Sequence, residues 1–351
     1  MDLLNKTLSH IQPLNENAMQ QARERLDSLL KPPGSLGRLE EIAVVMAGIT
    51  GSGGGSLKKK TIIVMCADNG VTDEMVSSFP RAISALVAET MLGGISGVSV
   101  LARHAGAEIM VIDIGLEGDV SDGRIINRKI RRATGNIARG PAMDREEALR
   151  AIETGIELAS SAIDRGADIL GTGEIGIGNT TTASAVLHAF TGKNLDEIVG
   201  RGAGLSDEGL LHKKDVIRRA VELNRPDPDD GVDVLSRVGG FDIAGLAGCY
   251  LAAAARRKPI VIDGFIAGVA AVAAMKMAPA ARDFMFASHA SAEPGVSAIS
   301  GVLGLAPMLA LEMRLGEGTG CALAFHIIEA ALKIMNEMGT FKDIGMEATA
   351  P

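Results

Sequence analysis

The sequence predicts an α/β fold built on a doubly wound parallel sheet. From Thr61 onward, short apolar runs alternate with longer segments of helical periodicity, and glycine-rich turns follow several of the runs. Asp68, Asp113 and Glu174 each stand near the end of such a run. Strands separated by helices of this length form parallel βαβ units with right-handed crossovers. Ligands bind beyond the carboxyl ends of the strands in such sheets, so we expect the functional site at the edge where these acids lie.

The composition limits the classes of partner. The chain has 351 residues, enough for one large α/β unit or for two domains. Its net charge of −8 argues against a general nucleic-acid or membrane-surface binder. Forty-three glycines, no Trp and a single Tyr indicate tight turns and helices that pack closely through small residues.

The cysteines and the apolar segments indicate the compartment. Cys66, Cys249 and Cys321 are odd in number and far apart, so we expect neither a disulfide framework nor a zinc site. The N-terminus has no basic segment followed by an apolar one, and we read no signal peptide. The most apolar stretch, residues 259–281, is interrupted by two charged residues and is too short to span a bilayer. These features predict a cytoplasmic protein.

The N-terminal segment predicts helices that pack outside the sheet. Helical periodicity covers residues 15–30, and the proline pair of KPPGSLGRLE ends that helix. Ser35 is expected to cap a second helix over residues 36–49, with a structural hinge between the two. Residues 51–56, GSGGGS, are typical of a flexible connection.

The α/β part follows in order along the chain. Asp144, with Glu147 three residues later, predicts a capping box at the start of a long helix. The expected strands are 61–67, 108–115, 167–170, 259–264 and 283–289. The expected helices are 81–92, 144–165, one that begins at the threonines 180–182, 206–224, an alanine-rich helix that ends near 256, a small-residue helix after 264, and 319–335.

The stretch GTGEIGIGNTTT, residues 171–182, is the one that the rest of the chain is expected to face. Glycine lets a ligand approach backbone N–H groups closely, and a helix that begins at the threonines would direct its positive end at an anion. These features indicate a phosphate-ester pocket that contains the carboxylate of Glu174. A tight strand-to-helix turn of an α/β domain would produce the same pattern, so both interpretations stay open.

GTGEIG also matches the dinucleotide fingerprint GxGxxG, which is the basis for one alternative function, an NAD-dependent oxidoreductase. The match is weak, because the preceding strand lies in the middle of the chain and the acid expected about 20 residues later is only loosely offered by Asp196. The one Gly-Lys pair, Gly192-Lys193, is followed by Asn194, so the chain has no Walker-type phosphate loop.

Two further turns carry carboxylates. His289 and Glu293, in SHASAEPG, have a spacing that could chelate a metal on a helix, but Pro294 favours a hydrogen-bonded strand-to-helix turn. Glu317 lies between glycines just before a helix. Apolar walls would raise the pKa of Glu317 and make it a useful base, while an ordinary acid at a helix N-terminus is the alternative.

Seven motifs together carry a resemblance to a known family. In order they are KPPGSLGRLE, ADNGV with the following VSSFP, GEIGIGNTTTASA, GRGAGLSDEGL with HKK, DGFIAG, SHASAEPG and LGEGTGCALA. They resemble the nicotinate-nucleotide:dimethylbenzimidazole phosphoribosyltransferase family, and the resemblance extends from about Leu14 to Met335. Seven motifs in a single order make it highly specific.

The resemblance implies an enzyme of lower-ligand assembly in cobamide (vitamin B12) synthesis. Such an enzyme transfers the 5-phosphoribosyl group of nicotinate mononucleotide to a base, releases nicotinate and forms an α-ribotide, without a cofactor or metal. Glu317 resembles the general base that removes the proton of the attacking base. The site residues that the resemblance implies are catalytic Glu317, Glu174 and Lys213; nucleotide- and phosphate-binding Gly176, Gly178, Asn179, Thr180, Gly202, Ser291 and Gly316; and an acceptor pocket of Ser77, Phe79, Pro80 and Leu315.

The resemblance also implies the domain organisation and the partners. It implies a Rossmann-like sheet with a small helical domain formed by both ends of the chain, residues 1–58 with 320–351, and a large α/β catalytic domain, residues 59–319. The implied partners are nicotinate mononucleotide and an aromatic base, with no nucleic acid and no membrane. The implied assembly is a homodimer, or a heterodimer with a paralogue if the acceptor is a phenol.

Two departures from the family concern the acceptor. Asn69 stands where the family usually has His, and the helix after Pro80 lacks the glutamine that contacts the benzimidazole; the three glutamines of the chain lie at positions 12, 20 and 21. We therefore expect a different or broadened acceptor, such as phenol, p-cresol or adenine, beside dimethylbenzimidazole. A non-catalytic partner subunit would keep the pocket but lose the base, and the presence of Glu317 argues against that alternative.

Overall fold

The computed structural model describes residues 2–53 and 55–346, and in these residues six parallel strands form one sheet. The strand order is β3-β2-β1-β4-β5-β6, which is the doubly wound Rossmann order, so the predicted α/β fold class is confirmed. The order reverses between β1 and β4, the position at which such sheets bind ligands. The strands are β1 (Lys60–Ala67), β2 (Ala107–Gly115), β3 (Ile126–Asn127), β4 (Ile169–Ile175), β5 (Ile260–Ile262) and β6 (Met285–Ala287).

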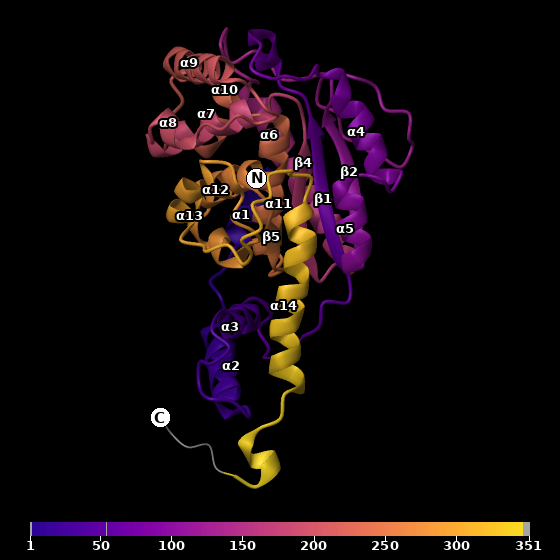
Figure 1. Ribbon diagram of the computed structural model, residues 1–351, viewed down its shortest axis with the longest axis vertical. Helices are drawn as coiled ribbons and strands as arrows, with labels where there is room; N and C mark the ends of the chain where they lie inside the picture. The colour runs from indigo at the N-terminus through magenta and orange to yellow at the C-terminus, as the bar shows by residue number, and fades with distance from the viewer. Residues whose placement is uncertain (1, 54, 347–351) are drawn as a thin grey trace.

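Helices cover both faces of the sheet (Figure 1). α4, α5 and α14 pack on one face, and α11 and α12 pack on the other. The helices are α1 (Leu3–His10), α2 (Glu16–Ser28), α3 (Arg38–Thr50), α4 (Ala82–Leu92), α5 (Gly97–Ala105), α6 (Arg145–Asp164), α7 (Asn179–Thr191), α8 (Leu195–Ile198), α9 (Asp207–Asn224), α10 (Gly231–Val238), α11 (Phe241–Ala255), α12 (Phe265–Met277), α13 (Val296–Leu303) and α14 (Thr319–Glu337), with the short 3₁₀ helices η1 (Gly70–Glu74), η2 (Pro279–Phe284) and η3 (Phe341–Ile344).

The second layer on one face explains the alanine- and glycine-rich sequence of α11. This helix lies between the sheet and α6, and nearly every residue of it is buried, as expected of a helix that is apolar on all sides. A Cβ atom at Gly155 of α6 would collide with the carbonyl oxygen of Gly245 in α11. The two helix backbones therefore approach closely through small residues, as the composition indicates.

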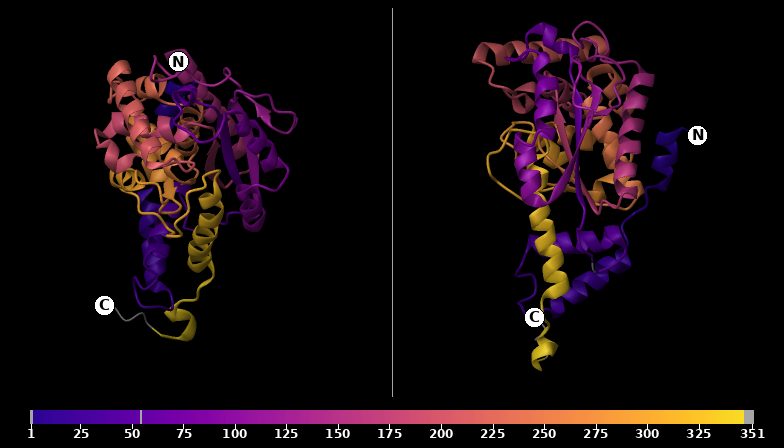
Figure 2. Two further views of the ribbon diagram at one scale, coloured as in Figure 1. Left: turned by 45° about the horizontal axis from the view of Figure 1, so that its top comes forward. Right: turned by 90° about the vertical axis from the view of Figure 1, so that its right-hand side faces the viewer.

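α2, α3 and the C-terminal half of α14 form an extension below the sheet (Figure 1). α2 packs on α3, and both contact the C-terminal half of α14, which runs down from the sheet (Figures 1 and 2). α1 lies apart from them and packs on α6 and α11. The division at residues 58 and 319 stays a prediction, and residues 1, 54 and 347–351 of the predicted small domain lie outside the described residues.

Several predicted elements are confirmed, and two local predictions are wrong. Asp144 forms the capping box of α6 with Glu147, and α14 begins at Thr319. Ser35 does not cap α3, because the helix begins at Arg38 and Gly37 occupies the N-cap position without a side-chain hydrogen bond. The expected strand over 167–170 is too short, since β4 continues through GTGEI to Ile175 and this segment is not the loop that its glycines indicate.

The segment Ala82–Ala105 is apolar and long enough to cross a membrane by length and composition alone. In the structure a turn at residues 93–96 divides it into α4 and α5. Both helices pack on β2, and α5 also packs on α14. The hydropathy of this segment therefore reflects two helices that cover one face of the sheet.

Candidate functional site

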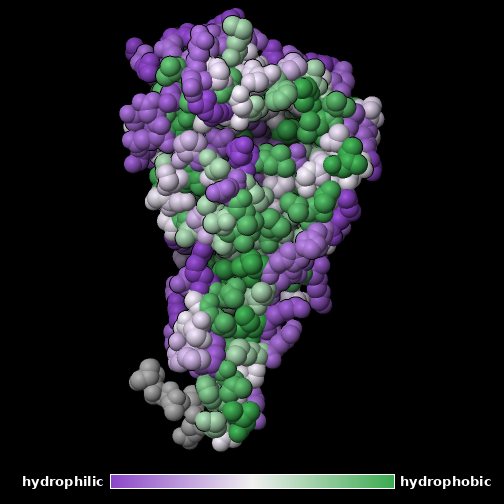
Figure 3. Space-filling model, in the orientation of Figure 1, coloured by the Kyte–Doolittle hydropathy of each residue, from purple (hydrophilic) through white to green (hydrophobic). Residues whose placement is uncertain are grey.

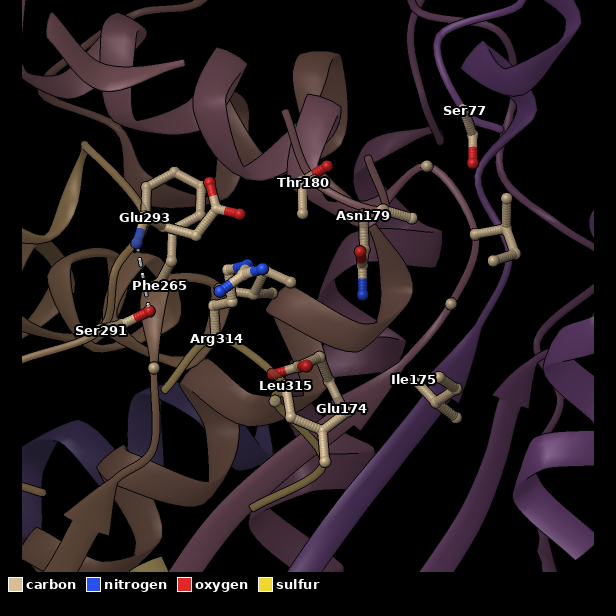
Figure 4. Close-up of a pocket in the computed structure, with 18 of the residues that line it drawn as sticks. Ser77, Glu174, Ile175, Asn179, Thr180, Phe265, Ser291, Glu293, Arg314 and Leu315 are labelled. Atoms are coloured by element: carbon tan, nitrogen blue, oxygen red, sulfur yellow. Dashed lines mark hydrogen bonds between the residues drawn. The ribbon is translucent and has the colours of Figure 1, made fainter. Parts of the chain in front are cut away.

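A cavity of about 280 Å³ lies at the carboxyl end of the sheet, beside the end of β4 (Figure 4). It is bounded by the β4–α7 turn, by the segment that follows β6 and by the loop before α14. The predicted site residues that line it are Ser77, Glu174, Gly176, Gly178, Asn179, Thr180, Gly202, Ser291, Leu315 and Gly316. Residues from opposite ends of the sequence therefore meet at the edge predicted from the strand pattern.

Four predicted site residues lie outside the cavity lining. Lys213 and Glu317 are buried directly beside it. Phe79 and Pro80, by contrast, are exposed on the segment before α4, and 49% of the Phe79 surface is accessible. Of the predicted acceptor pocket, only Ser77 and Leu315 belong to the cavity wall.

The β4–α7 turn has the geometry of an anion site. α7 begins at Asn179, so the threonines form its first turn, and the turn before it places backbone N–H groups at the positive end of the helix. Gly176 is required there because a Cβ atom would collide with the carbonyl oxygen of Ala67 in the neighbouring strand. Gly178, with φ of 90°, adopts a left-handed conformation that favours glycine.

Lys213 supports this turn from behind. Its side chain is fully buried in α9, and its Nζ donates hydrogen bonds to Thr180 Oγ1 at 2.8 Å and to the carbonyl oxygen of Gly200 at 3.1 Å. Burial lowers the pKa of Lys213 to about 8, and the negative charge of Glu293 opposes that shift. At neutral pH the anion site therefore has a cation behind Thr180.

Glu174 stands on β4 at the bottom of the cavity. Burial raises the pKa of its carboxyl group well above the ordinary value, and the negative charges of Asp263 and Asp242 raise it further, against a hydrogen bond from the backbone of Glu317. A carboxyl group with its pKa raised in this way holds a proton more readily than one in water. Glu174 can therefore donate a hydrogen bond to a ligand oxygen.

Glu317 lies on the loop before α14 in an uncommon backbone conformation. Its φ is 64°, in the left-handed region that residues with a side chain rarely adopt. Its Oε2 accepts a hydrogen bond of 3.1 Å from the N–H of Val98, in the first turn of α5. Burial raises the pKa of Glu317, and this hydrogen bond lowers it. Glu317 Oε2 and Leu315 Cδ2 both lie beside Gly97, so the carboxylate is behind the part of the cavity wall that Leu315 forms.

Asp263 fixes the loop that carries Glu317. Its Oδ2 accepts from the N–H of Gly318 at 3.0 Å, and its Oδ1 accepts from the N–H of Gly320 at 2.7 Å. Burial raises the pKa of Asp263 to about 7, and the hydrogen bonds from the loop lower it. The β5 end and the start of α14 are joined in this way, so the position of Glu317 depends on Asp263.

A second buried acid, Asp242, lies beneath the β1 end of the site. Burial raises its pKa to about 7, and the backbone N–H groups of Ile243 and of Asp242 itself, which lie near the carboxylate, lower it. Asn69 Oδ1 and Asp242 Oδ1 both lie beside Gly240. Asn69 also accepts a hydrogen bond from Thr182 Oγ1 at 3.3 Å. The position that departs from the family pattern is thus hydrogen-bonded to α7 and lies near this acid.

The cavity also contains residues that the sequence analysis did not assign to the site. Phe265, Arg201 and Arg314 line it, and so does Glu293, which the sequence placed only in a hydrogen-bonded turn. The only signal for Arg314 is its place directly before the motif LGEGTG. No spacing rule relates it to Glu293, because the loops that carry them meet only in the fold.

The dinucleotide fingerprint and the metal site are the two other interpretations of the motifs, and the structure bears on both. Gly171 and Gly173 of GTGEIG lie within β4 rather than in a strand-to-helix turn, so the segment lacks the geometry of a dinucleotide fingerprint. His289 Nδ1 lies 3.0 Å from Ser288 Oγ. Within residues 2–53 and 55–346, no group of three His, Cys, Asp or Glu side chains is arranged to hold a metal ion.

Comparison with known proteins shows extensive similarity. A family model described as "Phosphoribosyltransferase" matches residues 11–346. A nicotinate-nucleotide–dimethylbenzimidazole phosphoribosyltransferase of Ruminiclostridium cellulolyticum is 52% identical over 346 residues, covering 99% of this chain and 98% of the relative. The protein of the same name from Clostridium tetani is 50% identical over 343 residues, covering 98% and 95%.

A solved structure shares the fold. The crystal structure of the enzyme of that name from Thermus thermophilus superposes with a TM-score of 0.90 at 38% sequence identity. The match covers 95% of this chain and 99% of the solved chain. Similarity in sequence and in structure therefore extends over the same, nearly complete length.

Proposed function

Because this chain belongs to the phosphoribosyltransferase family, we propose that it transfers the 5-phosphoribosyl group of nicotinate mononucleotide to an aromatic lower-ligand base in cobamide synthesis. The observation that carries the proposal is that the β4–α7 turn lines the cavity, while the buried Glu317 lies directly behind another part of its wall, Leu315. The first is suited to a phosphate and the second to the proton of an attacking base. The oxidoreductase alternative is not supported.

The phosphate is held by donors that are fixed before it binds. The N-terminus of α7, the glycines of the turn and the Thr180 hydroxyl face the cavity, and Lys213 lies behind Thr180. Groups that are already in position lose little freedom when the ligand binds, so the ribose is held for reaction at its anomeric carbon. Gly202, Ser291 and Gly316 complete the nucleotide-binding wall.

The acceptor approaches from the side of Ser77 and Leu315. As the acceptor's nitrogen or oxygen forms a bond to the anomeric carbon, the bond to nicotinate breaks and nicotinate leaves with the bonding electron pair. Glu317 takes the proton that the acceptor loses. Attack on the face opposite nicotinate gives the α-ribotide. Glu174, as a donor at the cavity floor, orients the ribose during this step.

The acceptor wall supports a broadened choice of base. Val76, Ser77, Ile175 and Leu315 offer an apolar surface with a single hydroxyl group, and no glutamine is among the residues that line the cavity. An apolar wall holds a flat ring but does not distinguish a benzimidazole from a phenol by hydrogen bonding. We therefore include phenol, p-cresol and adenine as acceptors beside dimethylbenzimidazole.

The assembly is proposed to be a homodimer in the cytoplasm. An apolar band runs down the face shown in Figure 3 toward the lower end of the molecule, and large exposed apolar side chains include Leu30, Ile344 and Met346. Exposed apolar surface of this kind is typical of protein contacts. A heterodimer with a paralogue is the alternative if a phenol is the acceptor, and light scattering of the purified chain distinguishes a monomer from a dimer.

Mass spectrometry of the products tests the proposed reaction. The purified chain is incubated with nicotinate mononucleotide and equimolar dimethylbenzimidazole, adenine, phenol and p-cresol. We expect release of nicotinate and a ribotide whose mass identifies the preferred base. A strong preference for dimethylbenzimidazole would contradict the broadened acceptor, and the absence of any ribotide while the nucleotide still binds would favour a non-catalytic subunit.

A further inference from the structure

The cavity has a second end that the phosphate and the acceptor leave unused. Phe265, Ser291 and Glu293 lie together on the side away from Ser77, and Arg314 lies between them and the cavity floor (Figure 4). An aromatic side chain such as Phe265 can stack on a ligand ring, and a hydroxyl group and a charged side chain can bind the polar substituent of that ring. The leaving pyridine is the remaining part of the substrate.

Arg314 is the unpaired cation at this end. Among the described residues its guanidinium has no ion-pair partner within 4.0 Å and makes no hydrogen bond. Arg201, the other arginine of the cavity, is paired with Asp207 and donates to the carbonyl oxygen of Leu205 at 2.9 Å. Arg314 thus has all of its donors available for a ligand, whereas Arg201 does not.

The charges of the substrate match this arrangement. Nicotinate mononucleotide carries two anionic groups, the phosphate and the carboxylate of the pyridine. In the proposed function the phosphate is bound at the N-terminus of α7, with Lys213 behind Thr180. Arg314 is the cation left for the carboxylate, and a guanidinium binds a carboxylate through two parallel hydrogen bonds.

Resting on the proposed function, we propose that Arg314 determines the leaving group by pairing with the pyridine carboxylate, so that nicotinate mononucleotide is preferred to its carboxamide counterpart. A carboxamide has no charge and presents one acceptor in place of two. A charge-assisted pair corresponds to a preference of roughly 10-fold to 100-fold.

Glu293 opposes Arg314 in this selection. Its Oε2 is buried and has no hydrogen-bond partner among the described residues. Burial raises the pKa of Glu293, and the positive charges of Lys213 and Arg314 lower it. A carboxylate beside the subsite repels the pyridine carboxylate and partly neutralises the field of Arg314. Loss of the Arg314 charge should abolish the preference for nicotinate mononucleotide over the carboxamide. Loss of the Glu293 charge should strengthen that preference.

Kinetics with two donors test this selection. The ratio of kcat/KM for nicotinate mononucleotide to that for nicotinamide mononucleotide is measured for the wild type, Arg314→Met, Arg314→Lys and Glu293→Gln. We expect Arg314→Met to bring the ratio near one, Arg314→Lys to retain part of it, and Glu293→Gln to raise it a few-fold. Arg201→Met is the matched control, because its paired guanidinium lies in the same cavity, and its ratio should equal that of the wild type.

If Arg314→Met lowers kcat/KM equally for both nucleotides, so that their ratio is unchanged, the proposal is overturned and Arg314 is a phosphate ligand. Titration with free nicotinate and free nicotinamide separates this result from failure of the proposed reaction. If the wild type transfers from neither donor yet binds nicotinate in an Arg314-dependent way, the reaction is wrong and the subsite stands. If nicotinate binding is the same in the wild type and Arg314→Met, the subsite is wrong whatever the reaction.

Discussion

Lys213 Nζ donates a hydrogen bond to Thr180 Oγ1 over 2.8 Å, from behind the cavity wall that Thr180 forms. An ammonium group has only protons to offer, so the Thr180 hydroxyl accepts this bond and its own proton stays free to point elsewhere. The buried lysine thereby makes Thr180 a donor toward the cavity. A cation outside the cavity thus makes one group of the cavity wall, the Thr180 hydroxyl, a hydrogen-bond donor.

Replacing Lys213 with Met should weaken nucleotide binding. The change removes the charge and the hydrogen bond that directs Thr180, so we expect the KM for nicotinate mononucleotide to rise about tenfold or more. Because the pKa of Lys213 is about 8, the KM of the wild type should also rise as the pH increases beyond 8, where the lysine loses its charge. Lys214→Met is the control, since Lys214 pairs with Asp196 of α8 and is not among the residues that line the cavity. A similar KM for the two variants would refute this role.

Replacing Glu317 with Gln should remove the base while the nucleotide still binds. A general base contributes roughly 10²- to 10⁴-fold to the rate, and we expect kcat to fall within that range. Glu312→Gln serves as the matched control, because Glu312 is an exposed acid of the same loop that also has a positive φ. Turnover that survives in Glu317→Gln would assign the proton transfer to another group.

The pH–rate profile should show the raised pKa of Glu317. The base acts when it is deprotonated, and burial raises its pKa from the ordinary value of 4.5. The rate should therefore fall with decreasing pH along a limb whose midpoint lies above 4.5. This limb should be absent from the residual rate of Glu317→Gln, and a midpoint at or below 4.5 would contradict the assignment.

Asp242 should make the stability of the protein depend on pH. Its pKa rises from 3.8 in the unfolded chain to about 7 in the folded protein, so the folded state holds the proton more strongly. The resulting stabilisation is complete below pH 3.8 and is lost as the pH rises through 7, by about 1.4 kcal/mol per pH unit in between. We expect the Tm of Asp242→Asn, relative to the wild type, to increase from pH 4 to pH 7 and then stay level. Asp229→Asn, at an exposed position, is the control variant.

Replacing Gly173 with Ala should disturb both the fold and the base. A Cβ atom there would collide with the carbonyl oxygen of Glu317, so the loop before α14 could no longer lie against β4. Overpacking of this kind costs about 1–3 kcal/mol, and we expect a lower Tm together with a loss of turnover. Gly301→Ala in α13 meets no atom within 4 Å and should retain both properties. Wild-type turnover in Gly173→Ala would show that the loop tolerates the shift.

Sequence reasoning succeeded where short-range chemistry decides the structure. The start of α6 follows from Asp144 and Glu147, and the start of α9 follows from Ser206, whose side chain accepts from the N–H of Gly209. The doubly wound parallel sheet is also a consequence of local pattern, because helices between apolar runs allow few parallel topologies. The carboxyl edge of the sheet was therefore predictable as the place of the site.

The errors arise where distant segments meet. GTGEI looks like a loop because of its glycines, yet those glycines make room for α14: Gly171 lies against Cys321 and Gly173 against Glu317. Tertiary contact thus overrides the low strand propensity of glycine. The contact of Lys213 with Thr180 and the nearness of Arg314 to Glu293 likewise depend on the packing of α9 and the last loop, which no sequence spacing encodes.

α14 connects the extension below the sheet directly to the loop that carries Glu317. α14 begins directly after Glu317 and Gly318, and its other end is held by α2 and α3. A helix of 19 residues is about 28 Å long, so a tilt of about 2° about its far end displaces the near end by about 1 Å. A shift of that size can cost a catalytic group about a hundredfold in rate. The packing of α2 and α3 on α14 thus fixes the position of the general base, and the rate of the reaction depends on how rigid that packing is.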